Sequence, residues 1–289
     1  MTNRANKKIV LSNSRTQFSK ENSFQMNAII LAAGFGTRLY PLTKFKPKAL
    51  LEIGDKTLLD HLIEKLEASP VIKKIVLVTN SRFALDFMEW AKKRVSCARK
   101  PLQIIENDVY EPEKRLGAVQ DLRLGIQAGQ DYPDGYVVLC GDNYFDYPLT
   151  HFIDLYCVGH KDHAFVGLYD VKDKSIASQY GVVEVDHASR ITDFQEKPEN
   201  PKSTRVSIGV YYIPNKFQLR VLEYLEIENL NPDKIGDFFA WLNTKETLHG
   251  VDFDGAWFDI GSIESYEGAR RHFDKRAPEC ISREDRKNA

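Results

Sequence analysis

A glycine loop followed by cations is the feature of this chain best suited to chemistry. Gly34 and Gly36 interrupt an apolar run, and Arg38 and Lys48 follow before the next carboxylate, Glu52. Glycines let backbone N–H groups approach a ligand closely, and such groups form concave anion sites. Arg adds a planar fork for phosphate oxygens, and Lys adds a point charge. The loop therefore predicts a polyphosphate site; the alternative is a glycine turn on a solvated basic surface.

Two common phosphate-binding motifs are absent from this loop. The P-loop pattern fails because no Gly-Lys pair follows Gly34 at the required spacing. The dinucleotide fingerprint fails because Leu39 stands where its third glycine belongs. The sequence therefore disfavours both a P-loop NTPase and a dinucleotide oxidoreductase.

Two aspartates at strand ends offer oxygen ligands for a cation. Asp142 follows the buried run 136–140, and Asp259 lies in the apolar stretch WFDIG. Ligands gather outside the carboxyl ends of strands in open α/β sheets, and a buried acid is costly unless it is paired or binds a cation. Mg²⁺ prefers carboxylate and phosphate oxygens. Taken alone, Asp142 is also explained as a turn residue and Asp259 as the N-cap partner of a helix near residue 263.

Five motifs follow one another along the chain: LAAGFGTRLYPLT with KPKALLEI, GDN at 141–143, QYGVVEVD at 179–186, EKP at 196–198 and WFDIGS at 257–262. In this order they resemble the motifs of the sugar-phosphate nucleotidyltransferases, the family that includes glucose-1-phosphate thymidylyltransferase and UTP- and GTP-using relatives. The resemblance implies transfer of a nucleoside monophosphate from a nucleoside triphosphate to a sugar 1-phosphate, with release of pyrophosphate and with Mg²⁺ as cofactor. For this chain we expect glucose 1-phosphate with dTTP or UTP.

The resemblance also implies roles for individual residues. Arg38 and the loop amides would hold the leaving phosphates, Lys48 would neutralise charge near the α-phosphate, and Mg²⁺ on Asp142 and Asp259 would bridge the reactants. Lys197 would bind the sugar phosphate, so that catalysis by Arg38, Lys48, Asp142 and Lys197 would consist of positioning and charge stabilisation. The expected nucleotide-binding residues are Leu31, Ala33, Gly34, Gly36, Thr37, Arg38, Asn107 and Gly117, and the expected sugar-phosphate-binding residues are Tyr180, Gly181, Glu196, Lys197 and Gly209.

Base recognition is where this chain departs from the family pattern. Family members often present a Gln before a GTA or GLA turn, whereas this chain has Asn107 and Asp108 and then LGAV at 116–119. Thymine, uracil, cytosine and guanine therefore all stay open. On the sugar side, the glycines at 181 and 209 also fit a bulge or bend, and Glu196 with Lys197 also fits an ordinary surface charge pair.

The elements that must position these residues alternate in the first half of the chain and change character in the second. Helical spacing and buried runs favour an α/β fold, namely a Rossmann-like, doubly wound, mixed and mainly parallel sheet with antiparallel additions in the second half, in a single domain. The predicted strands are 28–33, 74–79, 102–106, 136–140, 164–170, 181–185, 191–196 and 206–213, and the predicted helices are 58–66, 82–94, 116–128, 215–226 and 234–245.

Composition narrows the class of protein. The 289 residues are 43% hydrophobic with a formal charge of -1, which suits one α/β core and disfavours a nucleic-acid partner. No apolar run approaches the ~20 residues that span a bilayer, so we expect no membrane role. Four cysteines without zinc spacing fit free thiols in a reducing compartment, and we expect a cytoplasmic protein.

The expected organisation has three parts. Residues 1–25 are polar and basic and predict a disordered leader, residues 26–275 form the catalytic domain, and residues 276–289 form a polar C-terminal tail. No hexapeptide repeat is present, so we expect no β-helix domain. The sequence leaves a homo-oligomer open.

Two other functions fit part of the pattern. A CTP-dependent cytidylyltransferase acting on phosphocholine, or on a similar phosphorylated alcohol, would share the first loop. A non-catalytic regulator that binds nucleotide sugars would share the fold, although the presence of Arg38, Lys48, Asp142 and Asp259 argues against lost chemistry.

Overall fold

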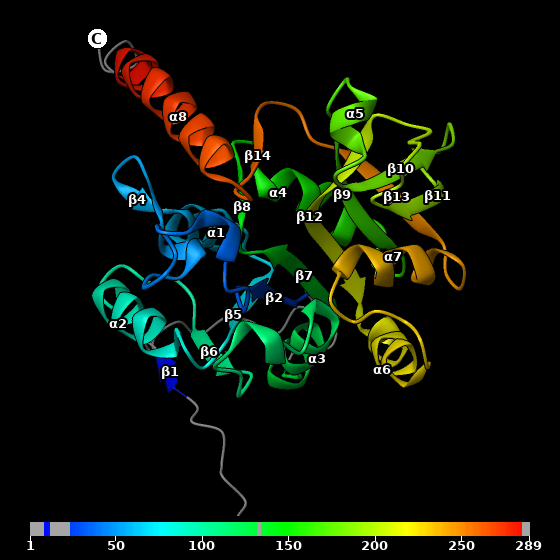
Figure 1. Cartoon of the computed structure of the whole chain (residues 1–289), viewed down its shortest axis with the longest axis horizontal. Coiled ribbons are helices and arrows are strands. Elements are labelled where there is room, and N and C mark those ends of the chain that lie inside the picture. The colour runs from blue at the N-terminus through cyan, green and yellow to red at the C-terminus, as the bar shows by residue number, and fades with distance from the viewer. Residues whose placement is uncertain (1–8, 12–23, 132–133, 285–289) are drawn as a thin grey trace, which may run out of the picture.

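A ten-stranded mixed sheet forms the centre of the computed structural model, which describes residues 9–11, 24–131 and 134–284 (Figure 1). Its strand order is β1-β6-β5-β2-β7-β12-β10-β11, with β9 paired to β12 and β13 paired to β9. The run β6-β5-β2-β7 is parallel, whereas β12 pairs antiparallel with β7, β9 and β10. The predicted α/β class, a single domain with a parallel first half and antiparallel additions, is confirmed.

The first half of the chain alternates strands and helices as its apolar periodicity predicted. Observed and predicted bounds of these strands and helices differ by at most two residues. In the parallel run the chain enters at β2, winds outward through β5 to β6, and returns to the other side of β2 at β7, so the strand order reverses at β2. The elements are β2 (Met26–Leu31), α1 (Leu58–Glu67), β5 (Ile72–Thr79), α2 (Ala84–Arg94), β6 (Leu102–Glu106), α3 (Ala118–Ala128) and β7 (Gly135–Cys140), with the small strands β3 (Glu52–Ile53) and β4 (Lys56–Thr57) and the 3₁₀ turns η1 (Thr37–Leu39), η2 (Lys48–Leu50) and η3 (Pro112–Lys114) between them.

The second half adds strands in close succession, and a separate ribbon pairs β8 with β14. This ribbon matters for the site because it carries the residues after Asp142 alongside Asp259. The elements are β8 (Asn143–Phe145), α4 (Leu149–His151), the π-helix η4 (Phe152–Val158), β9 (Ala164–Asp170), α5 (Lys174–Ala177), β10 (Gly181–Val185), β11 (Ile191–Glu196), β12 (Arg205–Pro214), η5 (Asn215–Phe217), α6 (Gln218–Glu226), α7 (Ile235–Asn243), β13 (Leu248–Asp252), β14 (Trp257–Asp259) and α8 (Ile263–Glu284).

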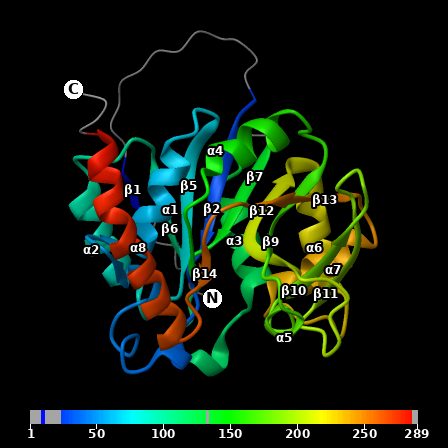
Figure 2. The ribbon, with the colours of Figure 1, turned by 90° about the horizontal axis from the view of Figure 1, so that it is seen from above.

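Helices cover both faces of the sheet, in three layers (Figure 2). Alternate residues of a strand point to opposite faces, so in β2 the side chain of Ile30 belongs to the apolar core that includes α1 and α2, whereas its neighbour Ile29 belongs to the core that includes α3, α6 and α7. Both side chains are fully buried. A strand that is buried on both faces has a continuous run of apolar residues, and this run allowed β2 to be predicted from the sequence.

The ends of the chain bear on the predicted organisation. Of the leader predicted to be disordered, residues 9–11 form β1 (Ile9–Leu11), which pairs antiparallel with β6, so the structure differs from the prediction at these three residues. Residues 1–8 and 12–23 lie outside the described part of the chain. Helix α8 continues across the boundary expected at 275, and its first half packs on the domain through Tyr266, Ala269 and Phe273. Among the described residues, no helix is long and apolar enough to cross a membrane.

Candidate active site

A cavity of about 350 Å³ opens where β2 and β7 end. This is the point at which the strand order reverses, and in open α/β sheets that reversal leaves a crevice at the carboxyl ends of the strands. The structure brings all the residues predicted to bind nucleotide to the walls of this cavity. They are Leu31, Ala33, Gly34, Gly36, Thr37, Arg38, Asn107 and Gly117.

The glycine loop presents free backbone donors to the cavity. Gly36 has a left-handed conformation with φ 63°, and the Thr43 hydroxyl donates to its carbonyl oxygen over 2.7 Å. The side chain of Asn80 donates to the carbonyl oxygen of Ala33 over 2.9 Å. Within the described part of the chain, the N–H groups of Gly34, Phe35 and Gly36 have no acceptor. The loop is thus held by its carbonyl groups and leaves its donors for an anion.

Gly34 keeps space open above these donors. A Cβ atom built at this position has no heavy atom within 4 Å, whereas one built at Gly36 would lie 3.3 Å from Thr43. The first glycine is therefore not required by packing within the protein. Its lack of a side chain leaves room for a ligand to reach the backbone.

Lys48 and Asp142, which both line the cavity, form an ion pair. The Lys48 Nζ lies 2.8 Å from Asp142 Oδ2, and the other carboxylate oxygen accepts a hydrogen bond of 3.0 Å from the Asn143 amide. The Asn143 carbonyl in turn accepts from the Trp257 indole over 2.7 Å. Burial opposes ionisation of Asp142, but the charge and hydrogen bond of Lys48 outweigh it and lower the pKa of the carboxyl. Asp142 is therefore held as an oriented carboxylate.

Asp259 lies beside Asp142, although 117 positions separate them in the sequence. Its strand β14 pairs with β8 so that Asp259 faces Asn143, and the Ile260 N–H donates to the Asp142 carbonyl oxygen over 2.9 Å. Burial, together with the negative charge of Asp142, raises the pKa of Asp259 to about 6, and the charge of Lys48 acts in the opposite direction. These two neighbouring carboxylates repel each other, and a divalent cation bound between them would offset that repulsion.

Arg38 reaches the same place from the glycine loop. A Cβ atom built on Gly261 would lie 3.1 Å from Asp259 Oδ2 and 3.5 Å from Arg38 Nη2, so the guanidinium and this carboxylate flank one glycine. Gly261 also lines the cavity. Arg38 is exposed and free to adjust to a ligand.

The residues predicted to bind the sugar phosphate form a second group, on the side of the antiparallel strands. Glu196 faces Gly181 across the β10–β11 pair, and the Lys197 N–H donates to the Tyr180 carbonyl oxygen over 2.9 Å. Lys197 has φ 50°, and its charge acts on Asp259. The predicted nucleotide-binding group and the predicted sugar-phosphate-binding group therefore meet at Asp259.

Glycines make room for the side chains of this second group of residues. A Cβ atom built on Gly181 would lie 3.1 Å from Glu196 Oε2, and one built on Gly236 at the start of α7 would overlap the same carboxylate. Burial raises the pKa of Glu196, while the charge of Lys197 opposes that effect. Gly209, with φ 70°, leaves no room for a Cβ atom beside Asn143.

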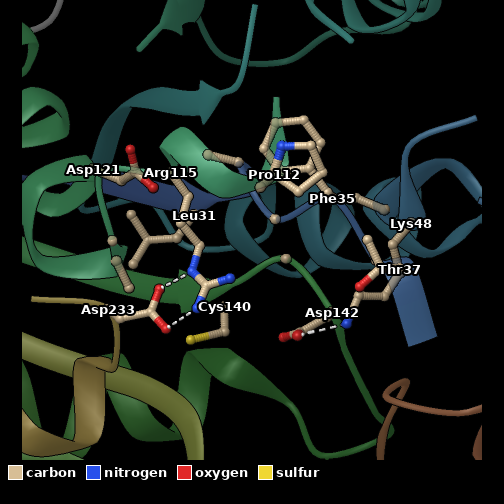
Figure 3. A pocket seen from close by; sticks show the side chains of 18 of the residues that line it. Leu31, Phe35, Thr37, Lys48, Pro112, Arg115, Asp121, Cys140, Asp142 and Asp233 are labelled. Carbon is tan, nitrogen blue, oxygen red and sulfur yellow. Dashed lines mark hydrogen bonds and ion pairs between the residues drawn. The ribbon is translucent and has the colours of Figure 1, made fainter. Parts of the chain in front are cut away.

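Residues that sequence reasoning missed form the other end of the cavity. Figure 3 shows Asp121, Arg115 and Asp233 on the side opposite Lys48 and Asp142. Arg115 binds Asp233 with two hydrogen bonds, of 2.6 and 2.9 Å, which join the segment before α3 to the segment before α7. The signal available in the sequence was the polar Asp121 placed one turn after Gly117, on the helix face that lines the cavity.

The comparisons with known proteins agree with this architecture. The family model described as "Nucleotidyl transferase" matches residues 27–276. A mannose-1-phosphate guanyltransferase of Aspergillus oryzae is 34% identical over 246 residues, which are 83% of this chain and 62% of that protein. The bifunctional protein GlmU of Methanocaldococcus jannaschii is 29% identical over 240 residues, 82% of this chain and 51% of that protein. The chain thus spans about half to three fifths of the length of these relatives.

A solved structure shares the fold over nearly its whole length. It is a Bacillus anthracis protein named as a glucose-1-phosphate thymidylyltransferase, in complex with sucrose, and it superposes with a TM-score of 0.73 at 26% identity. The superposition covers 86% of this chain and 95% of that one. With the family model matching most of the chain, this protein belongs to the nucleotidyl transferase family, as the order of its motifs indicated.

Proposed function

We propose that this protein transfers a nucleoside monophosphate from a nucleoside triphosphate to a sugar 1-phosphate. The observation that supports this most directly is the meeting of three features in one cavity: unpaired loop N–H groups, the cations Arg38 and Lys48, and the carboxylates Asp142 and Asp259. The N–H groups and the cations suit a polyphosphate, and the two carboxylates suit a metal cation that accompanies a polyphosphate.

In the proposed reaction an oxygen of the sugar phosphate attacks the α-phosphorus of the nucleotide. A new P–O bond forms there, the bond to the β-phosphate breaks, and pyrophosphate carries away the electron pair. The reactants are both anions, and two unit charges 4 Å apart interact by about 4 kcal/mol at an effective dielectric of ~20. The work of the protein is therefore to hold them in line against repulsion.

The loop side would bind the nucleotide phosphates. Gly34, Phe35 and Gly36 would donate N–H groups to the β- and γ-phosphates, Arg38 would grip the leaving pyrophosphate, and Lys48 would lie near the α-phosphate. On the other side, Lys197 would bind the phosphate of the sugar and Glu196 would accept hydrogen bonds from its hydroxyl groups. Asp259 lies between the two sides, because its pKa responds to the charges of Lys48 and Arg38 on one side and of Lys197 on the other.

The residues present suit Mg²⁺. Asp142 and Asp259 would hold the ion, and the described residues contain no larger cluster of acidic, histidine or cysteine ligands, which suits an ion completed by substrate phosphates. When bound, Mg²⁺ supplies charge neutralisation for the phosphates. The charge and hydrogen bond of Lys48 keep the Asp142 carboxylate ionised, and the hydrogen bond from Asn143 helps to orient it.

The identity of the sugar and of the base is a finer question. The sequence-based prediction of glucose 1-phosphate with dTTP or UTP stays a prediction, with support from the name of the B. anthracis structure. The name of the A. oryzae relative points instead to mannose 1-phosphate and GTP. A cytoplasmic location and a possible homo-oligomer also stay predictions.

The decisive experiment is a matrix of nucleoside triphosphates against sugar 1-phosphates and phosphocholine, read by pyrophosphate release with Mg²⁺ and with a chelator. We expect release with a sugar 1-phosphate and only with the metal. Release with phosphocholine and CTP alone would indicate the cytidylyltransferase instead. Binding without any release would indicate a non-catalytic regulator.

Lys197→Ala tests the assignment of the sugar-phosphate side. Removing this cation should raise the KM for the sugar phosphate by about 10-fold or more and leave the KM for the nucleotide nearly unchanged, because Lys197 lies outside the nucleotide cavity. Lys202→Ala, which breaks the exposed ion pair with Asp193, is the matched control. Unchanged kinetics in Lys197→Ala would exclude the proposed role.

A further inference from the structure

Asp121 is a buried acid that the proposed reaction does not use. It is 7% exposed, lies on α3 one turn after Gly117, and lines the cavity at the end away from Lys48. Burial raises its pKa to about 6; a hydrogen bond from Asn107 opposes this shift, and the charge of Asp233 adds to it. No cation of the described residues forms an ion pair with it. A buried carboxylate without a cationic partner costs folding free energy, so its presence at this position needs an explanation.

The neighbouring Asn107 has a fixed orientation. Its side-chain carbonyl accepts from the Val109 N–H over 3.1 Å, so its amide nitrogen must face Asp121, to which it donates over 2.8 Å. Each amide nitrogen carries two N–H groups, and the second has no acceptor among the described residues. The Asp121 oxygen Oδ2 likewise has no donor there. The cavity wall thus presents a carboxylate acceptor directly beside an amide donor.

This polar edge discriminates among nucleobases. Uracil and thymine offer one N–H between two carbonyl oxygens, and these oxygens would face the carboxylate unfavourably. Adenine and cytosine offer one amino group beside a ring nitrogen that accepts. Guanine offers two adjacent N–H donors, N1 and N2, for the carboxylate, and its O6 can accept from the remaining Asn107 N–H. Guanine alone makes two charge-assisted hydrogen bonds to Asp121.

We propose that Asp121 reads the nucleobase and selects guanine, with Asn107 as its positioning partner. This inference rests on the proposed function, because it takes the cavity to be the nucleotide site. The phosphates would then occupy the glycine loop, and the base would lie against α3. The partly exposed ion pair Arg115–Asp233, which we call the rim, lines the same end of the cavity.

The test is direct titration calorimetry of the full chain with GTP, CTP, ATP, UTP and dTTP in the presence of Mg²⁺. We expect the unaltered protein to bind GTP about 10–100-fold more tightly than UTP or dTTP, the range that a good bidentate contact supplies. Asp121→Asn replaces one acceptor by a donor and should abolish most of that preference while leaving UTP affinity nearly unchanged. Glu113→Gln, which changes an exposed acid outside the cavity, should keep the preference.

A second measurement uses the unaltered protein. Because protonated Asp121 cannot accept two N–H groups, the GTP-to-UTP affinity ratio should fall as the pH is lowered from 7.5 to 5, through the pKa of about 6. The ratio cancels the titration of the phosphates themselves, which both nucleotides share. Asp233 and Arg115 are the charged groups that face this end of the cavity, and Arg115 stays charged throughout.

The outcomes separate this inference from the proposed function. Equal affinities, a preference for any other base, a ratio independent of pH, or an Asp121→Asn variant that weakens all nucleotides equally would each overturn the selection of guanine. Selective GTP binding without pyrophosphate release would support the inference and overturn the transferase. Release with UTP or dTTP alone would support the transferase and overturn the inference.

Discussion

The two ends of the cavity are built in different ways. At the phosphate end, the donors and cations come from one continuous loop, and Asp142 follows its strand directly. At the base end, Asn107, Asp121 and Asp233 come from three separate segments, and pairwise hydrogen bonds hold them. Under the proposed function, the first end would bind phosphates through backbone geometry and charge, which suit any nucleoside triphosphate. Selectivity among the bases would then come from the second end, where single side chains decide the pattern of donors and acceptors.

The largest effect should come from the phosphate end, through Asp142→Asn. This change removes a carboxylate charge that would face the reacting phosphates and leaves Lys48 without its ion-pair partner. We expect kcat to fall by about 100–1000-fold, the usual result of losing one electrostatic contact at a reacting centre. Pyrophosphate release at saturating substrates measures this, with thermal melting as the check on folding.

The control for that prediction breaks an ion pair elsewhere. Asp193→Asn removes the partner of Lys202 at 2.7 Å, outside the cavity, and should leave kcat unaltered. A fully active Asp142→Asn variant would mean that the carboxylate pair has no part in the reaction.

The second effect separates two glycines of one loop. Gly34→Ala meets open space, so the protein should keep its stability, but the new methyl group would stand where phosphate approaches the backbone. We expect the KM for the nucleotide to rise about 10–100-fold, because misplacement of a substrate by about 1 Å has effects of this size. Steady-state kinetics with varied nucleotide measures it.

Gly36→Ala provides the contrast in the same loop. Its φ of 63° and the nearby Thr43 make the substitution strained, so it should cost at least about 1 kcal/mol of folding free energy. If both variants lost stability equally, the open space above Gly34 would not be reserved for a ligand.

The contrast between the two ends also explains what the sequence could predict. The glycine loop, Asp142 and the strands around them lie next to one another in the chain, so residue types and spacing identified them together. Asp259 could be placed beside Asp142 only through the family resemblance, because the β8–β14 pairing that joins them leaves no local signal. Asp121 was not predicted as a site residue because its role depends on its hydrogen bond with Asn107, and the Val109 N–H sets the orientation of Asn107. Such side-chain pairings follow from packing, which periodicity does not encode.

The third effect concerns stability at the base end. The pKa of Asp121 is raised to about 6 in the folded protein, above the unfolded value of 3.8, so the ionised carboxylate costs folding free energy at pH 7. That cost disappears as the pH falls through about 6 towards 4. Asp121→Asn should therefore be more stable than the unaltered protein by about 1–3 kcal/mol at pH 7, and by less at pH 5.

Denaturant unfolding at the two pH values measures this gain. A variant that is less stable at pH 7 would show that the carboxylate is a structural group, which would weaken the case for a base-reading role. A gain in stability with a loss of GTP preference would show that selectivity is maintained at a cost in stability.

The smallest effect should follow Arg115→Ala at the rim. Its ion pair with Asp233 is exposed, and exposed pairs contribute about 0–1 kcal/mol. The segment before α7 would stay in place, because the Ala118 and Val119 N–H groups donate to the carbonyl oxygens of Asp233 and Pro232. The charge of Asp233 would then act on Asp121 without compensation, so we expect the GTP preference to weaken only about twofold, and less in high salt. Calorimetric titrations at two salt concentrations measure this. A loss as large as that of Asp121→Asn would mean that Arg115 itself contacts the nucleotide, and that the rim rather than the buried acid carries the selectivity.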